Sequence, residues 1–469
     1  MAEFAFVSPE EARRFHAASL RVLETIGVRI EHPESVDLLL GAGARRGDDG
    51  RVLIPGRMVN EALEKAVKGF GMYDRLGGEA FRMEAGNTVF GTGSDAIYNI
   101  DRATWELRNS TLADVRENVR IVDALPNYDF TMSMALPHEV PESKLYPTVF
   151  AEMAANTTKP IISALTNLDD LRRVHEIAKI IAGGADALRA RPFYGLYLEP
   201  ISPLHIEASI AERALFCAEH EVPYTFAAGA NSGSGSPITP EGGVVQGGAE
   251  SLAGLVLGTL KNPNARFIYG SNTSSADMRT TVVSYGAPEW YKTVAIYAEM
   301  GKFYKLPTWG TAGCTDAHRL DAQAGLEAHE GVVLALQSGT TLAHDVGYMA
   351  YGSLYDARML VLCDSMIARA KMLLRPLDMS DNGLAIDAIE EVVREDMPYL
   401  AIPHTAENFR QCLWLPPAYI NRTKMEHYHT EQQLNEMLGA EVRRILAEHK
   451  PEPLAQAAAE QIEAYLATC

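Results

Sequence analysis

Cysteines, basic residues and long apolar runs are scarce in this sequence. Its 469 residues include five cysteines, which are widely spaced and never arranged as CxxC. Disulfide frameworks and zinc fingers depend on paired, closely spaced cysteines, so we expect neither. No apolar run approaches the ~18 residues that span a bilayer. The N-terminal residues also lack the apolar stretch of a secretory signal. We therefore expect a cytoplasmic protein without a membrane partner.

Positive charge is outnumbered, with 42 Lys and Arg against 61 Asp and Glu, for a net charge of −19. Nucleic acids and anionic membranes are bound by clustered Lys and Arg, so a nucleic-acid partner is not expected. A small molecule or a protein is the expected partner. The acidity itself has two interpretations: an ordinary soluble surface, or an electric field that attracts cations.

The hydrophobic content of 47% with 22% charged residues is enough for a large globular core. Short apolar runs rich in β-forming residues alternate with longer amphipathic stretches, which is typical of successive βα units. The expected strands are Thr88–Thr92, Tyr128–Ala135, Pro160–Leu165, Phe193–Leu198, Pro223–Ala228, Arg266–Ser271, Pro307–Ala312 and Thr340–Asp345. The expected helices are Leu112–Leu125, Lys144–Asn156, Asp169–Ala182, Ile206–Glu219, Gly243–Leu260, Glu289–Phe303, Asp321–Gln337 and Asp356 to about Leu374.

Eight βα units predict an α/β fold, the TIM (β/α)8 barrel. The alternative is an open doubly wound sheet, but no GxGxxG follows the first strand to open a nucleotide-binding helix. We expect a helical N-terminal extension over residues 1–80 and the barrel over 81–378. Residues 379–469 are expected to form a C-terminal helical cap packed on the barrel.

Functional residues of this fold lie at the carboxyl ends of the strands and in the loops that follow. The first strand leads into FGTGSDAIYNID, which holds Phe90 and Tyr98 on a glycine-rich turn; a tight turn capped by Asp95 is the structural alternative. The fourth strand ends in YLEPISPL, where Tyr197 precedes Glu199. A carboxylate in that place can bind a cation or act as a base.

Further candidates follow the fifth, sixth and seventh strands. Phe226 and Asn231 follow the fifth strand, and Asn272 follows the sixth. The segment WGTAGCTDAHRLDAQAGLEAHEG supplies Trp309, Asp316, Gln323 and Glu327. Gln323 and Glu327 are four residues apart and share a helical face. Cys314, Asp316 and His318 could also be read as metal ligands, but such spacing in a loop is common by chance, and we expect no metal.

The eighth strand ends in LAHDVGYMAYGS, with His344 at its carboxyl end and Tyr348 and Tyr351 beyond it. A lone histidine in an apolar strand is usually a core residue with satisfied hydrogen bonds. At the end of a barrel strand a functional role becomes equally plausible.

The segments FGTGSDAIYNID, YLEPISPL, DAQAGLEAHEG, TLAHDVGYM and HTAENFR together resemble the trimethylamine methyltransferase family, in particular its members without pyrrolysine. The resemblance covers essentially the whole chain in order. It implies a barrel that transfers a methyl group from an amine to the cobalt of a partner corrinoid protein. The founding members carry pyrrolysine in the barrel mouth, whereas this sequence holds only the twenty common residues; the missing position is expected near Gly313–Asp316.

The pyrrolysine-free branch implies a quaternary amine as substrate, such as glycine betaine, proline betaine or carnitine, and His344 is carried over as the catalytic residue because HDVGY matches the family best. When cobalt(I) attacks a methyl group on a quaternary nitrogen, a neutral tertiary amine departs, so no general acid is required. The protein positions and desolvates the substrate. Aromatic faces with a supporting carboxylate hold such a cation. The expected cage residues are Phe90, Tyr98, Tyr197, Phe226, Trp309, Tyr348 and Tyr351.

A betaine carboxylate would accept hydrogen bonds from His344, Asn231 or Asn272. We expect no tightly bound cofactor, because the chain acts on the cobalamin of its partner, and we expect a homo-oligomer. Two other functions stay open at this point. One is a barrel lyase or hydrolase that uses Glu199, Asp316 or His344 in acid/base chemistry. The other is a betaine-binding protein without activity.

Overall fold

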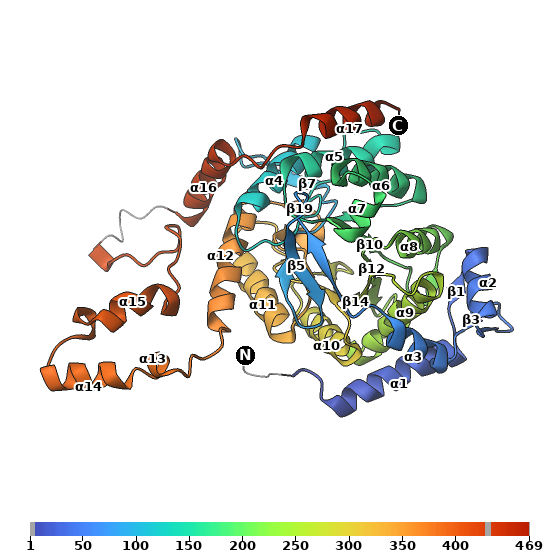
Figure 1. Ribbon diagram of the computed structural model, residues 1–469, viewed down its shortest axis with the longest axis horizontal. Helices are drawn as coiled ribbons and strands as arrows, with labels where there is room; N and C mark the ends of the chain where they lie inside the picture. The colour runs from blue at the N-terminus through green and yellow to red at the C-terminus, as the bar shows by residue number, and fades with distance from the viewer. Residues whose placement is uncertain (1–4, 427–432, 469) are drawn as a thin grey trace.

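A computed structural model describes residues 5–426 and 433–468 (Figure 1). Its centre is a ring of parallel strands: β6 (Val89–Phe90), the bridging pair Phe130 and Thr131, β9 (Ile161–Ala164), β10 (Tyr194–Leu198), β12 (Tyr224–Phe226), β14 (Phe267–Ala276), β16 (Thr308–Thr311) and β17 (Leu342–His344). Hydrogen bonds join β6 to β17 and continue around to β9. Bridges from Gly91 to Phe130 and from Thr131 to Ile161 close the ring. The predicted TIM barrel is confirmed.

Helices surround this ring. They are α4 (Leu112–Ala124), α5 (Leu145–Asn156), α6 (Leu168–Ala182), the short α7 (Ala185–Ala190), α8 (Ala208–His220), α9 (Pro240–Lys261), α10 (Pro288–Tyr304), α11 (Ala322–Ser338) and α12 (Ala357–Leu373). Local sequence fixes several ends. The Asp321 carboxylate accepts hydrogen bonds from the first N–H groups of α11, and Gly339 ends that helix with a φ of 72°.

The N-terminal part contains α1 (Pro9–Thr25), α2 (Pro33–Gly41), α3 (Gly56–Lys65) and the short strands β1 (Arg29–Ile30), β2 (Arg45–Arg46) and β3 (Val52–Leu53). A hairpin of β4 (Gly69–Tyr73) and β5 (Glu79–Glu84) follows, which the helical pattern did not predict. Its side chains Phe70, Met72, Phe81 and Met83 pack with residues from the beginnings of the barrel strands, such as Ile268 and Leu342. The hairpin therefore closes the end of the barrel opposite the expected site.

Additional strands extend the open end. β14 runs beyond the barrel and pairs with β13 (Ala228–Ser232) and β15 (Val283–Ser284). A small sheet beside it contains β7 (Tyr98–Ile100), β8 (Leu107–Asn109), β18 (Tyr348–Met349) and β19 (Leu354–Tyr355), while β11 (His205–Ile206) pairs with β1. The 3-10 turns η1 (Glu142–Lys144) and η2 (Ala350–Gly352) belong to loops on this side. We call the opening at the carboxyl ends of the barrel strands the mouth. The additional strands form a raised rim around it.

The C-terminal region divides into two parts. The C-terminal arm, residues 374–412, contains α13 (Asp381–Leu384), α14 (Ile386–Glu395), η3 (Tyr399–Ala401) and α15 (Pro403–Cys412), and it projects away from the barrel (Figure 1). The chain then returns to the barrel, where the Tyr419 hydroxyl donates a hydrogen bond to the Val361 carbonyl of α12. By contrast, α16 (Leu434–Glu448) packs on α12 and α4, and α17 (Gln456–Thr468) packs on α5 and α6. Within the described residues, we find no helix that combines the length and the apolar character needed to cross a bilayer.

Candidate active site

Tyr197 and Glu199 lie at the carboxyl end of β10, on the inner side of the barrel. The Tyr197 hydroxyl donates a hydrogen bond to Glu199 Oε2. Asn272 of β14 donates from Nδ2 to the Tyr197 hydroxyl at 2.9 Å. Three residues from two strands therefore form a chain of hydrogen bonds that ends on a carboxylate.

The Glu199 side chain is exposed to solvent even though protein surrounds it within the mouth. Burial raises the pKa of Glu199; the Tyr197 hydrogen bond and the nearby His344 lower that pKa, and Asp345 raises it. Because the side chain remains accessible, a cationic ligand that enters the mouth can approach it.

An aromatic stack lies beside this carboxylate. The rings of Tyr197 and Trp309 have centroids 5.1 Å apart at an interplanar angle of 21°. The His344 ring lies against Trp309, and the centroids of these two rings are 3.9 Å apart. Stacking across β10, β16 and β17 gives the lumen a continuous aromatic wall.

His344 is buried, and both of its ring nitrogens face acceptors. Nδ1 donates to the Gly310 carbonyl at 2.8 Å, and Nε2 lies 3.0 Å from Asp345 Oδ2. The same Asp345 oxygen accepts a hydrogen bond from Thr311 Oγ1 at 3.1 Å. Both nitrogens of His344 are therefore engaged, and the ring forms a hydrogen-bonded part of the wall of the site.

Tyr285, which follows β15, completes the aromatic lining and was not predicted. Asp316 accepts a hydrogen bond from the Tyr285 backbone N–H at 2.6 Å and holds it in place. The Tyr285 ring lies 6.1 Å from that of Tyr348. Burial raises the pKa of Tyr285, and the charges of Asp345 and Glu199 raise it further, so this phenol faces both carboxylates. No sequence signal marked Tyr285, because its loop comes after an extension of a strand rather than directly after one.

Two buried polar atoms of this lining have no hydrogen-bond partner among the described residues. They are Oδ1 of Asn272, an acceptor, and Nε1 of Trp309, a donor. Buried polar groups in proteins are normally satisfied, and an orphaned atom calls for an explanation. A bound molecule with polar groups would supply one.

A family model described as trimethylamine methyltransferase (MTTB) matches residues 1–469. The chain belongs to this family. It is therefore a methyltransferase of the MTTB family, and the family resemblance predicted from the sequence is confirmed. The match leaves the methyl acceptor and the amine open.

Two curated relatives of this MTTB member are methyltransferases by name. The chain is 29% identical to "Trimethylamine methyltransferase MttB" of Desulfitobacterium hafniense (strain DSM 10664 / DCB-2), over 82% of this chain and 78% of the relative. It is 24% identical to "Glycine betaine methyltransferase" of Desulfitobacterium hafniense (strain Y51), over 99% of this chain and 97% of that protein. Among solved structures, the hydroxylamine MtmB complex is similar in fold, with a TM-score of 0.50 at 12% identity, over 95% of this chain and 88% of that one.

The predicted site residues of this MTTB member fall into three groups. Those that line the lumen together are Tyr197, Glu199, Asn272, Trp309, His344 and Tyr348. Tyr348 is buried beside Tyr285 and Tyr355, and its hydroxyl donates to the Ser94 carbonyl. Asn231 lies higher on the rim, where its Oδ1 accepts a hydrogen bond from Ser274.

A second group shapes the loop after β16. The Glu327 carboxylate accepts hydrogen bonds from the Thr315 hydroxyl at 2.6 Å, from the Asp316 N–H at 2.9 Å and from Gln323 Nε2 at 3.0 Å. Gln323 and Glu327 thus hold the loop that carries Asp316, and Asp316 in turn holds the Tyr285 backbone. Cys314 donates its thiol hydrogen to the Tyr285 carbonyl, whereas His318 is exposed, so these residues do not converge with Asp316 on a metal site.

The third group lies outside the lumen, which corrects the expectation of a cage role. Phe90 is on the outer face of β6, near Lys371 of α12, and the Phe226 ring packs against Gly254 of α9. Alternate residues of a strand face opposite sides, and Val89 and Ala227 take the inner positions. Tyr98 and Tyr351 line a groove on the rim together with His318 and Arg319.

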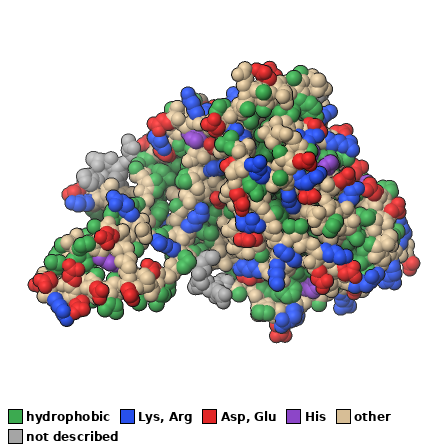
Figure 2. Space-filling view, viewed as in Figure 1, with side chains coloured by type: hydrophobic (Ala, Val, Ile, Leu, Met, Phe, Trp, Pro, Cys, Tyr) green, Lys and Arg blue, Asp and Glu red, His purple; other side chains and the backbone are tan. Residues whose placement is uncertain are grey.

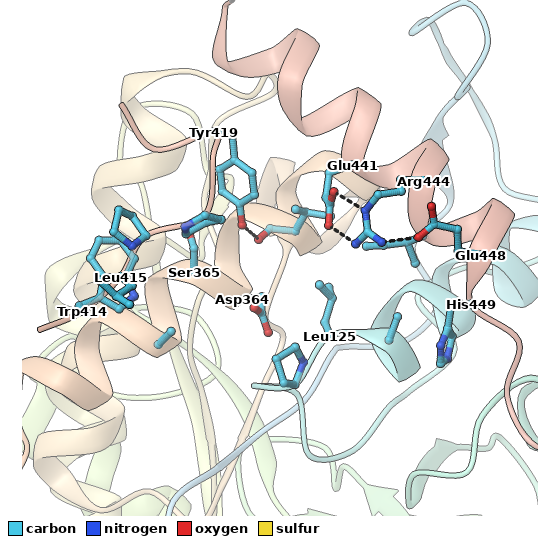
Figure 3. A pocket seen from close by; sticks show the side chains of 17 residues that line it. Leu125, Asp364, Ser365, Trp414, Leu415, Tyr419, Glu441, Arg444, Glu448 and His449 are labelled. Atoms are coloured by element: carbon cyan, nitrogen blue, oxygen red, sulfur yellow. Dashed lines mark hydrogen bonds and ion pairs between the residues drawn. The ribbon is translucent and has the colours of Figure 1, made fainter. Parts of the chain in front are cut away.

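A separate cleft lies outside the barrel, between α12 and α16 (Figure 3). Its lining includes Trp414, Leu415 and Tyr419, and none of its lining residues belongs to a barrel strand. Arg444 is bound by Glu441 and Glu448 on either side, at 2.6 Å each. The cleft therefore has a neutralised arginine and no connection to the site in the mouth.

Proposed function

We propose that this chain transfers a methyl group from a quaternary amine, of the glycine betaine type, to the cobalt(I) of a corrinoid carried by a partner protein. The observation that carries the proposal is the pairing of Glu199 with the aromatic faces of Tyr197, Trp309 and Tyr285 in one accessible mouth. Cationic groups are attracted by aromatic faces, and a carboxylate adds a direct charge. The relatives named as trimethylamine and glycine betaine methyltransferases support the same substrate class.

The proposed chemistry asks little of acid or base groups. Cobalt(I) attacks the methyl carbon, the carbon–nitrogen bond breaks, and the electron pair stays on nitrogen, which leaves as a neutral tertiary amine. Glu199 stabilises the positive charge of the bound substrate, and the aromatic wall fixes its orientation. The orphaned Trp309 Nε1 and Asn272 are available to a carboxylate or another polar group of the substrate. A histidine with both nitrogens engaged is compatible with this division of roles.

The rim of the mouth offers a surface for the corrinoid partner. Exposed apolar side chains recur on the loops that follow the barrel strands, namely Ile97, Leu107, Ile201, Ile238, Met278 and Val282. An apolar ring around an opening favours a protein that covers it. Covering the mouth would bring cobalt to the methyl group and exclude water.

The test is spectroscopic. The purified protein is mixed with cob(I)alamin and, in separate reactions, with glycine betaine, proline betaine, carnitine and trimethylamine, and the formation of methylcobalamin is followed. Methylation with a quaternary amine supports the proposal. Turnover of an amine without any corrinoid would favour the lyase or hydrolase, and binding without methylation, in the presence of the partner protein, would favour the binding protein.

His344→Ala, the most direct substitution at the predicted catalytic residue, is a poor test on its own. Removing the imidazole would leave the buried Asp345 without its partner and a void beside Trp309, which costs roughly 3–5 kcal/mol of folding free energy. His344→Gln retains a hydrogen-bond donor. If His344 only orders the wall, His344→Gln should retain most of the kcat; a loss of about 1000-fold with unchanged substrate binding would assign a direct catalytic role.

A further inference from the structure

Asn272 of β14 faces the lumen, and one of its atoms has no partner there. The preceding residue, Ser271, points outward, since a methyl group at Gly247 of α9 would overlap Ser271 Oγ. Alternate residues of a strand face opposite sides, so Asn272 faces inward. Its Oδ1 is buried and has no hydrogen-bond partner among the described residues. The lumen therefore presents a carbonyl oxygen that only a donor group can satisfy.

The chain of hydrogen bonds to Glu199 fixes which end of this amide is free. Tyr197 has a single hydroxyl hydrogen, which it donates to Glu199 Oε2. An ionised carboxylate only accepts, so the Tyr197 oxygen takes its second hydrogen bond from a donor. Asn272 Nδ2 supplies that bond at 2.9 Å. Turning the amide around would place Oδ1 against a hydroxyl with no hydrogen left to give, so Oδ1 is the free end.

This free oxygen lies beside the carboxylate that attracts the positive charge of the substrate. Asn272 pairs in register with Gly229 of β13, and a Cβ atom at Gly229 would overlap Glu199 Oε1. Asn272 and Glu199 are thus neighbours across Gly229 as well as through Tyr197. A donor group that reaches Oδ1 must therefore lie within a few bonds of the nitrogen that Glu199 attracts.

The charges of the mouth differ from those of the outer surface. On the side of the barrel that Figure 2 shows, Lys and Arg side chains are interspersed with Asp and Glu. Within the mouth, Glu199 and Asp345 both face the Tyr285 phenol, whose pKa is raised by burial and then by these two charges. Two carboxylates beside aromatic faces attract a cation and repel a carboxylate. A carboxylate of the ligand also has no hydrogen to donate, so it cannot satisfy Asn272 Oδ1.

A quaternary nitrogen carries no hydrogen, so the donor for Oδ1 has to belong to a substituent of the substrate. We propose that the substrate is a quaternary amine with a hydroxyl group on the second carbon from its nitrogen, and that this hydroxyl donates a hydrogen bond to Asn272 Oδ1. Such a hydroxyl can reach Asn272 while the nitrogen faces Glu199. The inference rests on the proposed function, which supplies the quaternary amine, and it makes Asn272 a specificity-determining residue.

The test compares ligands that differ by this hydroxyl group alone. Isothermal titration of the full chain measures the dissociation constant of carnitine against that of γ-butyrobetaine, and of choline against that of ethyltrimethylammonium. In at least one pair, we expect the hydroxylated member to bind about 10- to 100-fold more tightly. The reason is that the other member covers Oδ1 and leaves it without a hydrogen-bond donor.

Substitutions at Asn272 assign the preference to this residue. Asn272→Leu removes the acceptor and should bring the two affinities of the pair to within about twofold of each other. Asn272→Asp keeps an oxygen acceptor in the same place and should retain the preference. Asn264→Leu, at an exposed position before β14, is the matched control and should leave the preference unchanged. Circular dichroism checks that each variant is folded.

Several results would overturn the inference. Equal affinities within both pairs, or no binding of any of these compounds, would do so, as would a hydroxyl preference that survives in Asn272→Leu. Tighter binding of trimethylammonium than of tetramethylammonium, with the difference lost in Asn272→Leu, would assign Oδ1 to an N–H group instead.

Methylation of cob(I)alamin with the same compounds separates this inference from the proposed function. Methylation without any preference for the hydroxyl group would retain the function and overturn the hydroxylated substrate. A hydroxyl preference in binding that depends on Asn272, without methylation from any amine, would support the ligand and contradict the function.

Discussion

The mouth of the barrel and the C-terminal arm are both incomplete, in opposite ways. The mouth encloses polar and aromatic groups, and two of its buried polar atoms lack a partner among the described residues. The arm is joined by hydrogen bonds such as that from Asn382 to Asn408, but it exposes apolar side chains such as Ile386 and Leu400. Unpaired polar atoms in an enclosed site call for a small ligand, whereas a wide apolar surface calls for a macromolecule. The difference separates a region suited to a small ligand from a region suited to contact with a macromolecule.

The largest effect is expected at Glu199. Glu199→Gln keeps the shape of the side chain and removes the charge that faces the cation, so we expect kcat/KM for the quaternary amine to fall about 100- to 1000-fold. Steady-state methylation of cob(I)alamin measures it. Glu390→Gln on the arm is the matched control and should change kcat/KM by less than about twofold. Equal losses in both variants would erase the distinction between the two regions.

The same carboxylate predicts a pH dependence. Binding needs ionised Glu199, and burial raises its pKa above the ordinary 4.5 of a glutamate. The KM should therefore rise as the pH falls, starting at milder acidity than a free carboxyl group would cause. In Glu199→Gln the KM should be high but flat over that window. A KM of the wild type that does not respond to acid would remove Glu199 from the binding step.

Glu250 of α9 tests the buried charges that support the mouth. Its carboxylate accepts hydrogen bonds from the Leu204 N–H at 2.6 Å and the Ser202 hydroxyl at 2.9 Å, in the loop after β10. Burial raises the pKa of Glu250 to about 7. The protonated Glu250 carboxyl group stabilises the folded wild-type protein below pH 4.5, and this stabilisation is lost as the pH rises to about 7. Gln cannot ionise, so the free energy of unfolding of Glu250→Gln should gain roughly 2–3 kcal/mol relative to the wild type over that pH range. Urea unfolding at several pH values measures the gain; parallel curves would contradict it.

A smaller effect is expected at Gly229 on β13. A methyl group at this position would overlap Glu199 Oε1. Gly229→Ala should displace the carboxylate and lower kcat/KM about 10-fold, while the free energy of unfolding changes by about 1 kcal/mol or less. Gly325 of α11 has open space around its Cβ position, and Gly325→Ala is the control. Equal activity in the two variants would show that Glu199 tolerates displacement.

The smallest effect on activity is expected at Phe226. This ring packs under α9, outside the lumen, so Phe226→Leu should cost about 1–2 kcal/mol of stability and change the KM by less than about twofold. Tyr197→Phe, which removes one hydroxyl from the lumen, should change the KM more. Steady-state methylation of cob(I)alamin with the best amine measures the KM of both variants. A larger loss of affinity in Phe226→Leu would mean that the outer face of the barrel contributes to binding.

The barrel itself was predictable because its pattern repeats. Every expected strand, from Thr88–Thr92 to Thr340–Asp345, overlaps a strand or bridge of the structure, and the eight expected helices match α4 to α12 apart from the short α7. The barrel strands are buried and therefore apolar and β-rich, whereas the surrounding helices are buried on one side and therefore amphipathic, so the alternation of the two is visible in the sequence. The hairpin of β4 and β5 escaped prediction although burial alternates along both of its strands, because the whole segment before the first barrel strand was interpreted as a helical extension.

The site was predictable only in part. Strand ends located Tyr197, Glu199, Trp309 and His344, because the fold brings all strand ends to one mouth. In a short strand made only of apolar residues, the sequence does not show which residues face the lumen and which face the helices. Phe90 and Phe226 were therefore expected in the lumen, whereas they face outward. Tyr285 was missed because a strand extension, not a strand end, positions it.

The hairpin of β4 and β5 has one more consequence. Its side chains Phe70, Met72, Phe81 and Met83 close one end of the barrel, so that among the described residues the lumen opens at the mouth. Under the proposed function the corrinoid partner protein covers that same mouth. The amine must then enter before the partner arrives, and the demethylated amine must wait until the partner has departed. Turnover would follow a compulsory order, with the release of the smaller product gated by the larger molecule.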